Sequence, residues 1–360
     1  MKVLIVDDSV VFRTQISAAL SGVPQIEVAG SAPNGSIALQ KLKQLSVDLV
    51  TLDMEMPDMD GIEVLKAIRE KSFNVRVIVF SSQTTKGAER ALKALEAGAD
   101  DVVAKPSSGD SQFNKSPQER IREVLVPKIL QFVKGSEKPP VVQTHSSEKF
   151  TLDSQTPSPE GFQKSPLLGF YPSVIVIASS TGGPTALELI FSQFPANLRT
   201  PILIAQHMPP VFTKILAKRL SDLSKRECDE AKHGEVITPG KIYVAPGDHH
   251  LQIVRKDGYP TLELHQGPQR NSVRPAADYL FESAAAIFGT QCLGMVLTGM
   301  GQDGLCGALA VKRAGGRIVI QDEKSCVVFG MPGAVFKANC YDEIRDLEQI
   351  TALLKELAVH

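Results

Sequence analysis

Short apolar runs alternate with helix-like segments through the first 134 residues of the sequence. The runs include VLIV, LVTLD, VIVF and DVVAK, and the stretches between them place apolar residues at helical spacing. Five strand–helix repeats of this kind predict a doubly wound parallel sheet with helices on both faces. The working crevice of such a sheet lies at the carboxyl ends of its strands, so the residues that end each run are the first candidates for a site.

Carboxylates, hydroxyls and a lysine end these predicted strands. In chain order they are Asp7, Asp8, Asp53, Ser81 and Lys105. Three clustered carboxylates repel one another unless a hard cation lies among them, and oxygen ligands of this kind suit Mg²⁺. A carboxylate beside Mg²⁺ and a lysine can attack a phosphoryl donor, because the cations offset the charge that develops on the phosphoryl oxygens. Asp53 is therefore the central candidate for a phosphate acceptor.

The motifs DD, LDMEMPDMDG, FSS and AKP together resemble the receiver domain of two-component response regulators. The resemblance implies a flavodoxin-like fold and phosphorylation of Asp53 by a histidine kinase. It also implies the other site residues: Asp7, Asp8, Asp53 and the Glu55 carbonyl for Mg²⁺, Ser81 for the phosphoryl group, and Lys105 as its charge partner. The alternative is that these acids are solvated loop charges, which would require every receiver position to coincide at a strand end by chance.

Residues 135–169 differ in composition from the chain on either side. They are rich in Ser, Pro, Lys, Gln and Glu and show no sustained strand or helix period, which predicts a flexible tether. Scattered apolar residues such as Phe162 and Leu167 could dock on either neighbour. The predicted organisation is a receiver domain over residues 1–134, a linker over 135–169 and a second domain over 170–360.

The second domain opens with VIVIASSTGGP, residues 174–184. A continuous apolar run followed by a Gly-rich turn predicts a buried strand that leads directly into a helix. The turn matches a relaxed form of the strand–Ser–helix elbow G-x-S-x-G, with Ala178 in place of the first glycine, and it would expose Ser180. The alternative is that these hydroxyls and glycines only cap the helix or bind a phosphate at its N-terminus.

Two later runs end in the partners that a serine nucleophile needs. PILIAQHMPP places His207 at a strand end, and CLGMVLTGMGQDG presents Asp303 on a Gly-rich loop. Acyl transfer uses a hydroxyl, an imidazole that takes its proton, and a carboxylate that holds the imidazole. The backbone N–H groups of Thr181 and Met300, in the Gly-rich loops, are candidates for binding the oxyanion.

Each of these residues also has a structural interpretation. His207 could be a satisfied structural histidine, and Asp303 could be a helix N-cap. His249 and His250, which follow Asp248, form a rival constellation for a metal or a different base. No Cys or further acidic ligand accompanies them, so the joint Ser–His–Asp hypothesis is favoured.

The motifs ASSTGG, AQHMPP, VAPGDHHL, NSVRPAAD and LTGMGQDG resemble the catalytic domain of chemotaxis protein-glutamate methylesterases. The family usually has Gly-Ala-Ser-Thr-Gly-Gly, so Ala178 and Ser179 are departures, and alignment on the following Thr-Gly-Gly selects Ser180. The resemblance implies a serine hydrolase in a Rossmann-like domain, with Ser180 as nucleophile, His207 as base and Asp303 as the residue that orients it. It also implies hydrolysis of glutamate methyl esters on methyl-accepting chemoreceptors, with methanol released, and deamidation of receptor glutamines.

With a receiver in front, the expected protein is a phosphorylation-regulated hydrolase with a chemotaxis histidine kinase as its phosphodonor. The fold class expected is α/β, with two doubly wound parallel-sheet domains joined by a flexible linker. Mg²⁺ is expected in the receiver and no cofactor in the esterase site. The alternative function is a receiver-controlled, noncatalytic protein-binding regulator.

The charge balance and the cysteine pattern limit the expected cellular location and the expected classes of binding partner. Lys and Arg number 39 against 40 Asp and Glu, so the chain lacks the basic field that nucleic-acid binding requires. Five scattered cysteines without a C-x-x-C pair indicate a reducing, cytoplasmic location. No apolar run reaches membrane-spanning length, so membrane contact is expected only through receptors.

Overall fold

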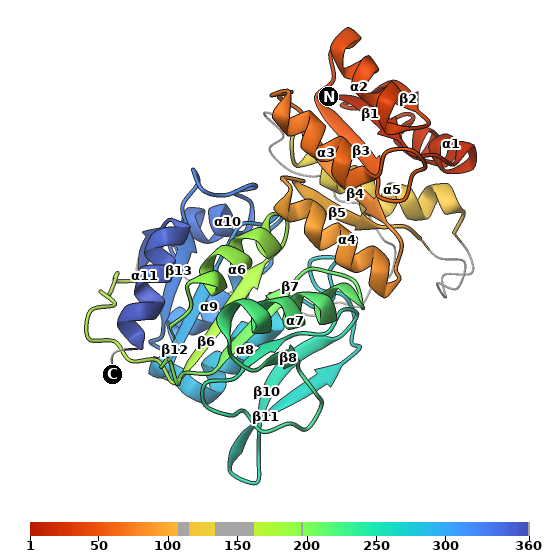
Figure 1. Ribbon diagram of the computed structural model, residues 1–360. Helices are drawn as coiled ribbons and strands as arrows, with labels where there is room; N and C mark the ends of the chain where they lie inside the picture. The colour runs from red at the N-terminus through yellow and green to blue at the C-terminus, as the bar shows by residue number, and fades with distance from the viewer. Residues whose placement is uncertain (107–114, 134–161, 196, 359–360) are drawn as a thin grey trace.

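The computed structural model describes residues 1–106, 115–133, 162–195 and 197–358. Figure 1 shows two α/β units, one formed by the N-terminal part of the chain and one by the C-terminal part. Each is a parallel sheet with helices on both faces, which confirms the predicted fold class. Residues 135–161, most of the predicted linker, lie outside the described residues.

The N-terminal sheet has the strand order β2-β1-β3-β4-β5, and its paired strands are all parallel. This is the order of flavodoxin-like folds, in which the ligand crevice lies beside the first and third strands. Its strands and helices are β1 (Lys2–Val6), α1 (Val10–Leu20), β2 (Glu27–Ala32), α2 (Gly35–Gln44), β3 (Leu49–Asp53), α3 (Gly61–Glu70), β4 (Arg76–Ser81), α4 (Thr85–Glu96), β5 (Asp101–Ala104) and α5 (Pro117–Leu130).

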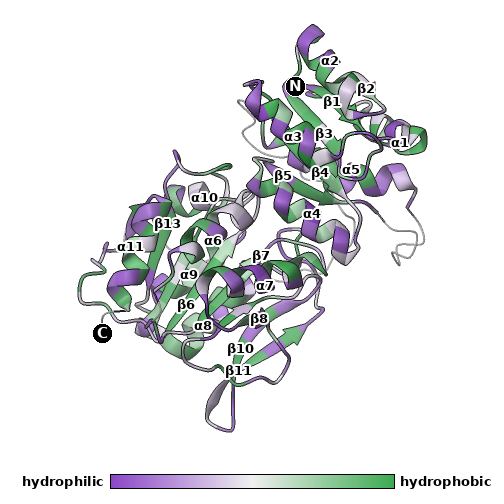
Figure 2. Cartoon of the chain, in the orientation of Figure 1, coloured by the Kyte–Doolittle hydropathy of each residue, from purple (hydrophilic) through white to green (hydrophobic). Residues whose placement is uncertain are grey.

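The apolar runs form strands here because helices cover both faces of the sheet. Every residue of β3 is buried, and the central strands are hydrophobic along their length in Figure 2. The helices begin soon after the strand ends because side chains cap their first turns. Asp60 and Ser116 each form a reciprocal capping box with the glutamate three residues later.

The C-terminal unit contains a seven-stranded parallel sheet in the order β14-β13-β12-β6-β7-β9-β8. An antiparallel hairpin, β10 with β11, lies outside that sheet. The elements are β6 (Val174–Ser179), α6 (Gly183–Ser192), β7 (Ile202–Gln206), α7 (Phe212–Ser224), β8 (Cys228–Glu230), β9 (Ile242–Val244), β10 (His250–Lys256), β11 (Tyr259–His265), α8 (Ala277–Phe288), η1 (Gly289–Gln291), β12 (Cys292–Val296), α9 (Leu305–Arg313), β13 (Arg317–Gln321), α10 (Met331–Lys337), β14 (Glu343–Arg345) and α11 (Leu347–Leu357).

The order of this sheet reverses at β6. The chain moves outward from β6 through β7 on one side, and it returns to the other side of β6 with β12. Loops that leave the carboxyl ends of β6 and β12 therefore diverge at a switch point, which is where ligand crevices form in open parallel sheets.

The last residues of the predicted linker contact the C-terminal unit. The Ser165 N–H donates to Asp342, the Leu167 N–H donates to Glu343, and the Leu167 side chain is 4% exposed. These contacts add apolar burial and satisfy backbone donors. We therefore propose that the catalytic unit begins near residue 162 rather than at residue 170.

The two units meet at the edge of the receiver sheet formed by β5. There α4 packs on α7, and the α4 residues Ala88 and Ala91 are buried against Phe212. Partly buried neighbours complete this apolar cluster: Val102, Ala104, Met208, Val211 and Ile215. Arg219 in α7 forms ion pairs with Glu188 in its own unit and with Glu96 in α4.

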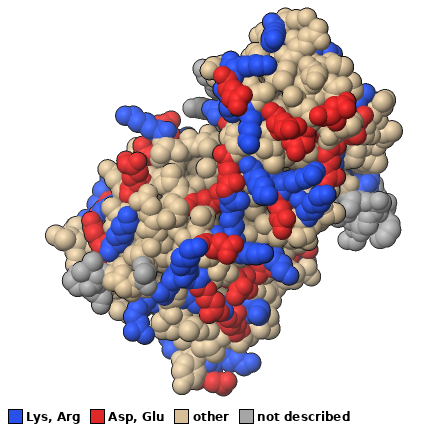
Figure 3. Space-filling view, in the orientation of Figure 1, with Lys and Arg blue, Asp and Glu red and all other residues tan. Residues whose placement is uncertain are grey.

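The surface carries charges of both signs. On the face shown in Figure 3, basic and acidic side chains are interspersed over both units. No helix in the part of the chain that the structure describes has the length and apolar character needed to cross a membrane.

Candidate active site

Ser180 lies between the end of β6 and the start of α6, in the tight turn that the sequence predicts. Gly182 has a left-handed backbone (φ 77°), and a Cβ there would approach Val327 to 2.6 Å. A side chain is excluded on both steric and conformational grounds. The turn therefore depends on glycine, and it leaves Ser180 half-buried just after the carboxyl end of β6.

A buried polar pair lies beneath the nucleophile candidate. The Ser179 hydroxyl donates to Gln206 Oε1 at 2.6 Å, and Gln206 Nε2 donates to the Ser180 carbonyl at 2.9 Å. Ser179 is 0% exposed, so it has no access to a substrate. The Ser179–Gln206 pair instead holds the backbone of Ser180, a role that the sequence analysis did not assign to Gln206.

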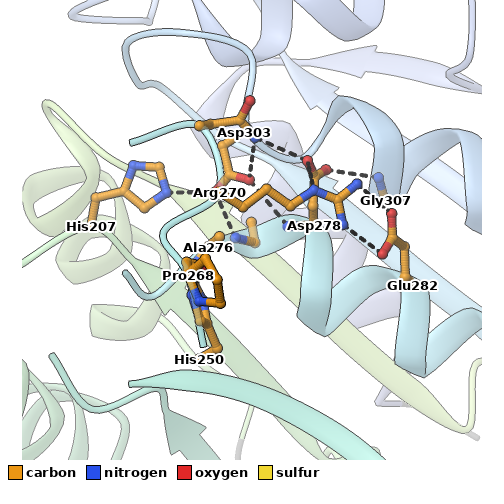
Figure 4. Close-up of polar contacts among 11 residues, drawn as sticks. His207, His250, Pro268, Arg270, Ala276, Asp278, Glu282, Asp303 and Gly307 are labelled. Carbon is orange, nitrogen blue, oxygen red and sulfur yellow. Dashed lines mark hydrogen bonds and ion pairs between the residues drawn. The ribbon is translucent and has the colours of Figure 1, made fainter. Parts of the chain in front are cut away.

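His207 and Asp303 come together as predicted. His207 Nε2 lies 2.7 Å from Asp303 Oδ2, with both side chains largely buried. Figure 4 shows the imidazole directed at the carboxylate. A proton on Nε2 satisfies Asp303 and leaves Nδ1 as the basic nitrogen. The Ser180 hydroxyl has no hydrogen-bond partner among the described residues, so the third contact of the proposed triad is not made in this arrangement.

Asp303 receives more donors than His207 alone. It also accepts the N–H groups of Ala277 (2.6 Å) and Asp278 (3.2 Å), at the start of α8, and the side-chain amide of Asn271 (3.1 Å). Burial acts to raise the pKa of Asp303. The hydrogen bond and charge of His207, with the two N–H groups, outweigh burial and hold that pKa below its usual value. Asp303 is thus an ionised acceptor that also satisfies donors at a helix N-terminus.

The predicted oxyanion donors flank Ser180. A Cβ on Gly299 would lie 2.8 Å from the Ser180 Cβ, so the loop that carries Met300 passes directly beside the serine. The Ser180 N–H itself is used, donating to the Thr298 carbonyl at 3.0 Å. Within the described chain, no backbone or side-chain acceptor takes the N–H of Thr181 or Met300. Both therefore remain available for a developing oxyanion.

The predicted phosphate-acceptor site forms at the carboxyl ends of the receiver strands. Ligand oxygens of Asp7, Asp8 and Asp53 lie within 4.8 Å of one another, and this set of hard oxygen donors fits Mg²⁺. Lys105 Nζ lies 2.8 Å from Asp53 and 3.0 Å from Asp7. Burial raises the pKa of Asp53, although Lys105 acts to lower it.

The other two predicted receiver residues are close by but differently engaged. The Glu55 N–H donates to Asp53 Oδ1 at 3.3 Å. The Ser81 hydroxyl is buried and donates to the Gly87 carbonyl at 2.8 Å. A contact between Ser81 and a phosphoryl group on Asp53 would thus have to replace that hydrogen bond.

One member of the rival histidine pair, His250, has a structural role. His250 is fully buried, accepts the Ala276 N–H at Nδ1 (3.1 Å) and donates from Nε2 to the Pro268 carbonyl (3.1 Å). Burial lowers its pKa, so the ring is neutral with both nitrogens engaged. Neither nitrogen is left for a metal. Figure 4 shows this ring below the residues that surround Asp303.

A receiver residue reaches the turn of the nucleophile candidate. The Thr181 hydroxyl donates to Asp101 Oδ2 at 2.6 Å and lies 3.2 Å from Gln131 Oε1. Asp101 is in turn paired with Lys128 of α5. The residue next to Ser180 is therefore bonded to the N-terminal unit, a contact that the sequence motifs do not reveal.

Comparison with known proteins matches both halves of this description. Residues 3–114 match the family model of the response regulator receiver domain, and residues 175–354 match that of the CheB methylesterase. A protein-glutamate methylesterase/protein-glutamine glutaminase of Trichodesmium erythraeum is 43% identical over 352 residues, which cover 97% of this chain and 96% of that protein.

The chain belongs to the CheB methylesterase family. A protein-glutamate methylesterase/protein-glutamine glutaminase of Nocardioides is 42% identical, over 99% of this chain and 96% of that protein. The crystal structure of the Thermotoga maritima CheB methylesterase catalytic domain is 42% identical with a TM-score of 0.50, over 52% of this chain and 98% of that one. Family membership over the whole chain favours the enzyme over the noncatalytic regulator.

Proposed function

We propose that this chain is a phosphorylation-regulated serine hydrolase that demethylates glutamate methyl esters on chemoreceptors and deamidates receptor glutamines. The observation that carries the proposal is the His207–Asp303 pair, formed at the point where the sheet order reverses, beside the Ser180 turn. Family membership supplies the substrate class, since the relatives in Trichodesmium erythraeum and Nocardioides are named for both activities.

The chemistry follows from the placement of the side chains. Ser180 Oγ attacks the ester carbonyl while His207 Nδ1 takes the hydroxyl proton, and Asp303 stabilises the resulting imidazolium. The N–H groups of Thr181 and Met300 receive the negative charge that forms on the carbonyl oxygen.

The intermediate then breaks down in two stages. His207 returns the proton to the departing methoxy group, so methanol leaves and a glutamyl-serine ester remains. Water attacks that ester while His207 takes one of its protons, and His207 then gives this proton to Ser180 Oγ as the bond to the glutamate side chain breaks. A receptor glutamine follows the same course with ammonia as the leaving group.

The receiver supplies regulation in this proposal. Asp53 accepts a phosphoryl group from a chemotaxis histidine kinase, and Lys105 and Ser81 contact that group. Asp7, Asp8, Asp53 and the Glu55 carbonyl would hold Mg²⁺, which offsets phosphoryl charge when bound. The contact of Asp101 with Thr181 supports a docked state in which the receiver restrains the catalytic turn.

The proposed location follows from the partners. The substrates are the cytoplasmic helices of methyl-accepting receptors, so the enzyme works in the cytoplasm and meets the membrane only through them. The evenly mixed charge on the face in Figure 3 offers no basic patch for nucleic acid.

Methanol release from methylated receptor membranes tests the proposal. Full-length protein should release methanol, faster with a small-molecule phosphodonor, and Ser180→Ala should release none above background. Binding of receptors without methanol release would instead identify a noncatalytic regulator.

A further inference from the structure

We propose that Asn271 and Asp278 are positioning residues of the active site. The Asn271 amide bridges the buried carboxylates of Asp278 and Asp303, and it holds Asp303 ionised and directed at His207. This inference rests on the triad of the proposed function.

The bridge uses both protons of one amide group. Asn271 Nδ2 lies 3.0 Å from Asp278 Oδ2 and 3.1 Å from Asp303 Oδ1. An amide nitrogen carries two hydrogens, so it can donate one to each carboxylate. With Asn271 in place, Asp278 and Asp303 are each 1% exposed, so little water reaches their charges. The amide takes the place that water would occupy between two like charges.

The contacts of Asp278 favour its ionised form. Its Oδ1 accepts the Gly307 N–H at 2.8 Å, and its Oδ2 lies 3.3 Å from Arg270 Nε. Arg270 is itself held by a two-pronged pair with Glu282, at 2.7 Å for each bond. Figure 4 shows Arg270 lying between Asp278 and Glu282. Every group bonded to Asp278 is a donor, and these donors favour the carboxylate over the carboxylic acid.

Burial and repulsion act against these donors. Burial first, and then the charge of Asp303, raise the pKa of Asp278 to about 6. Asp278 is therefore the carboxylate that takes up a proton first as pH falls, and because its charge and that of Asp303 repel each other, the pair titrates as a unit. Five titratable groups face the pair from the surrounding elements: His207, His250, Arg270, Glu282 and Cys306. Of the donors to the pair, the Asn271 amide is the one that contacts both carboxylates.

The loop that carries Asn271 is fixed at both ends. His250 binds the Pro268 carbonyl and the Ala276 N–H, which lie on either side of the loop. Arg274 is paired with Asp248 from the neighbouring turn. Asn271 has φ 54°, a left-handed conformation that asparagine adopts more readily than most residues. The loop thus presents a short amide side chain in a fixed position.

Asn271→Ala in the full-length protein tests the bridge. Asn271 is exposed, so its removal leaves the core intact. Ser272→Ala is the matched control, since Ser272 is exposed in the same loop and has φ 62°. We expect kcat for methanol release to fall about tenfold in Asn271→Ala, with KM within about twofold, because the lost contact orients a catalytic group rather than the substrate.

The pH profile separates this role from a purely structural one. Without the amide, one carboxylate of the pair keeps a proton to higher pH, and a protonated pair supports the His207 imidazolium poorly. The acid-side midpoint of kcat should therefore move upward in Asn271→Ala by about half a pH unit or more. Asn271→Asp, which adds a third acid, should move it further in the same direction.

The outcomes distinguish this inference from the proposed function. Methanol release by the wild type, abolished in Ser180→Ala, decides the function. An unchanged acid-side midpoint in Asn271→Ala and Asn271→Asp would overturn the bridge, whatever the loss of rate. A matching fall in Ser272→Ala would also overturn it, because the loop backbone would then be responsible rather than the amide.

Discussion

The proposed phosphate-acceptor site and the proposed esterase site each centre on one buried aspartate at the carboxyl edge of a parallel sheet. Asp53 is 2% exposed and Asp303 is 1% exposed. Asp53 is bonded to Lys105 and, at 3.3 Å, to one backbone N–H. Asp303 is bonded to four donors on four different residues. Burial raises the pKa of Asp53, whereas the donors around Asp303 overcome burial and lower its pKa.

This difference matches what each carboxylate has to do. An attacking carboxylate needs an oxygen whose lone pairs are not all engaged, and Asp53 retains one. A carboxylate that only orients an imidazole works best when every oxygen is fixed, and the start of α8 supplies the donors that fix Asp303. The number of donors, rather than the residue type or its depth, separates the two chemistries.

The largest expected effect is at the nucleophile. Ser180→Ala should reduce methanol release to background, a loss of about a million-fold if this triad behaves like other serine hydrolases. Ser179→Ala should keep most of the activity, because the Ser179 hydroxyl is buried and donates to the scaffold residue Gln206. Release of methanol from methylated receptors measures both, and equal losses would mean that the two hydroxyls have been assigned wrongly.

Asp303→Asn should be the next most severe change. The asparagine amide would present N–H groups where the Asp303 carboxylate now accepts hydrogen bonds. His207 would lose its anionic partner and would no longer be held in the tautomer with the proton on Nε2. We expect kcat to fall about ten-thousand-fold. The same change at the receiver aspartate, Asp53→Asn, should leave unstimulated activity intact. If both substitutions left basal methanol release unchanged, Asp303 would not be the orienting residue.

Much of this comparison could be predicted from sequence, because strand ends are local features. Asp53 ends its strand, Ser180 and His207 directly follow theirs, and parallel sheets bring such ends to one edge. Glycines marked the Asp303 loop and the Ser180 turn. The predicted parallel-sheet fold was confirmed. It could be predicted for the same reason, because each strand–helix repeat lies within a short stretch of chain.

The contacts that tune the sites could not be predicted in this way. Asn271 lies 32 residues from Asp303, and Asp101 lies 80 residues from Thr181. Such pairs depend on how distant loops and the two units pack against each other. The hydrophobic periodicity of a short stretch gives no information about that packing. The motif NSVRPAAD contains both Asn271 and Asp278, but nothing in it indicates that they lie beside a third residue's carboxylate.

A third prediction concerns the docking of the two regions. A fragment of residues 162–360 keeps the contacts of Ser165 and Leu167 with the catalytic unit and loses the Asp101–Thr181 contact. If the receiver restrains the turn, this fragment should release methanol faster than the unphosphorylated full-length protein. Reversing a gate that is closed 99 times in 100 takes about 5.5 kcal/mol, so phosphorylation should give a partial rise.

The measurement compares the fragment, the full-length protein and Asp53→Asn at equal concentration, with and without a phosphodonor. Asp53→Asn should lose the stimulated rise and keep the basal rate. A fragment no faster than the unphosphorylated full-length protein would exclude restraint by docking, and phosphorylation would then act through receptor recruitment or direct activation.

The smallest effect concerns stability, where the same substitution should act in opposite directions at the two aspartates. The pKa of Asp53 is raised in the folded state, so ionising it costs stability as pH rises from the unfolded value of about 3.9 through the folded one. Asp53→Asn removes that cost, and without divalent cations at pH 7 it should raise the receiver's thermal midpoint by a few degrees, or about 1 kcal/mol.

The pKa of Asp303 is lowered in the folded state. Its ionised form therefore stabilises the fold at pH values above the pKa of the unfolded chain, and this stabilisation is lost as pH falls through the pKa of the folded state. Asp303→Asn should therefore lower the thermal midpoint of the catalytic unit at pH 7, and the decrease should be smaller in acid. Calorimetry of both full-length variants from pH 4 to 8 measures the two midpoints. Shifts of the same sign in both variants would show that the number of donors does not separate the two sites.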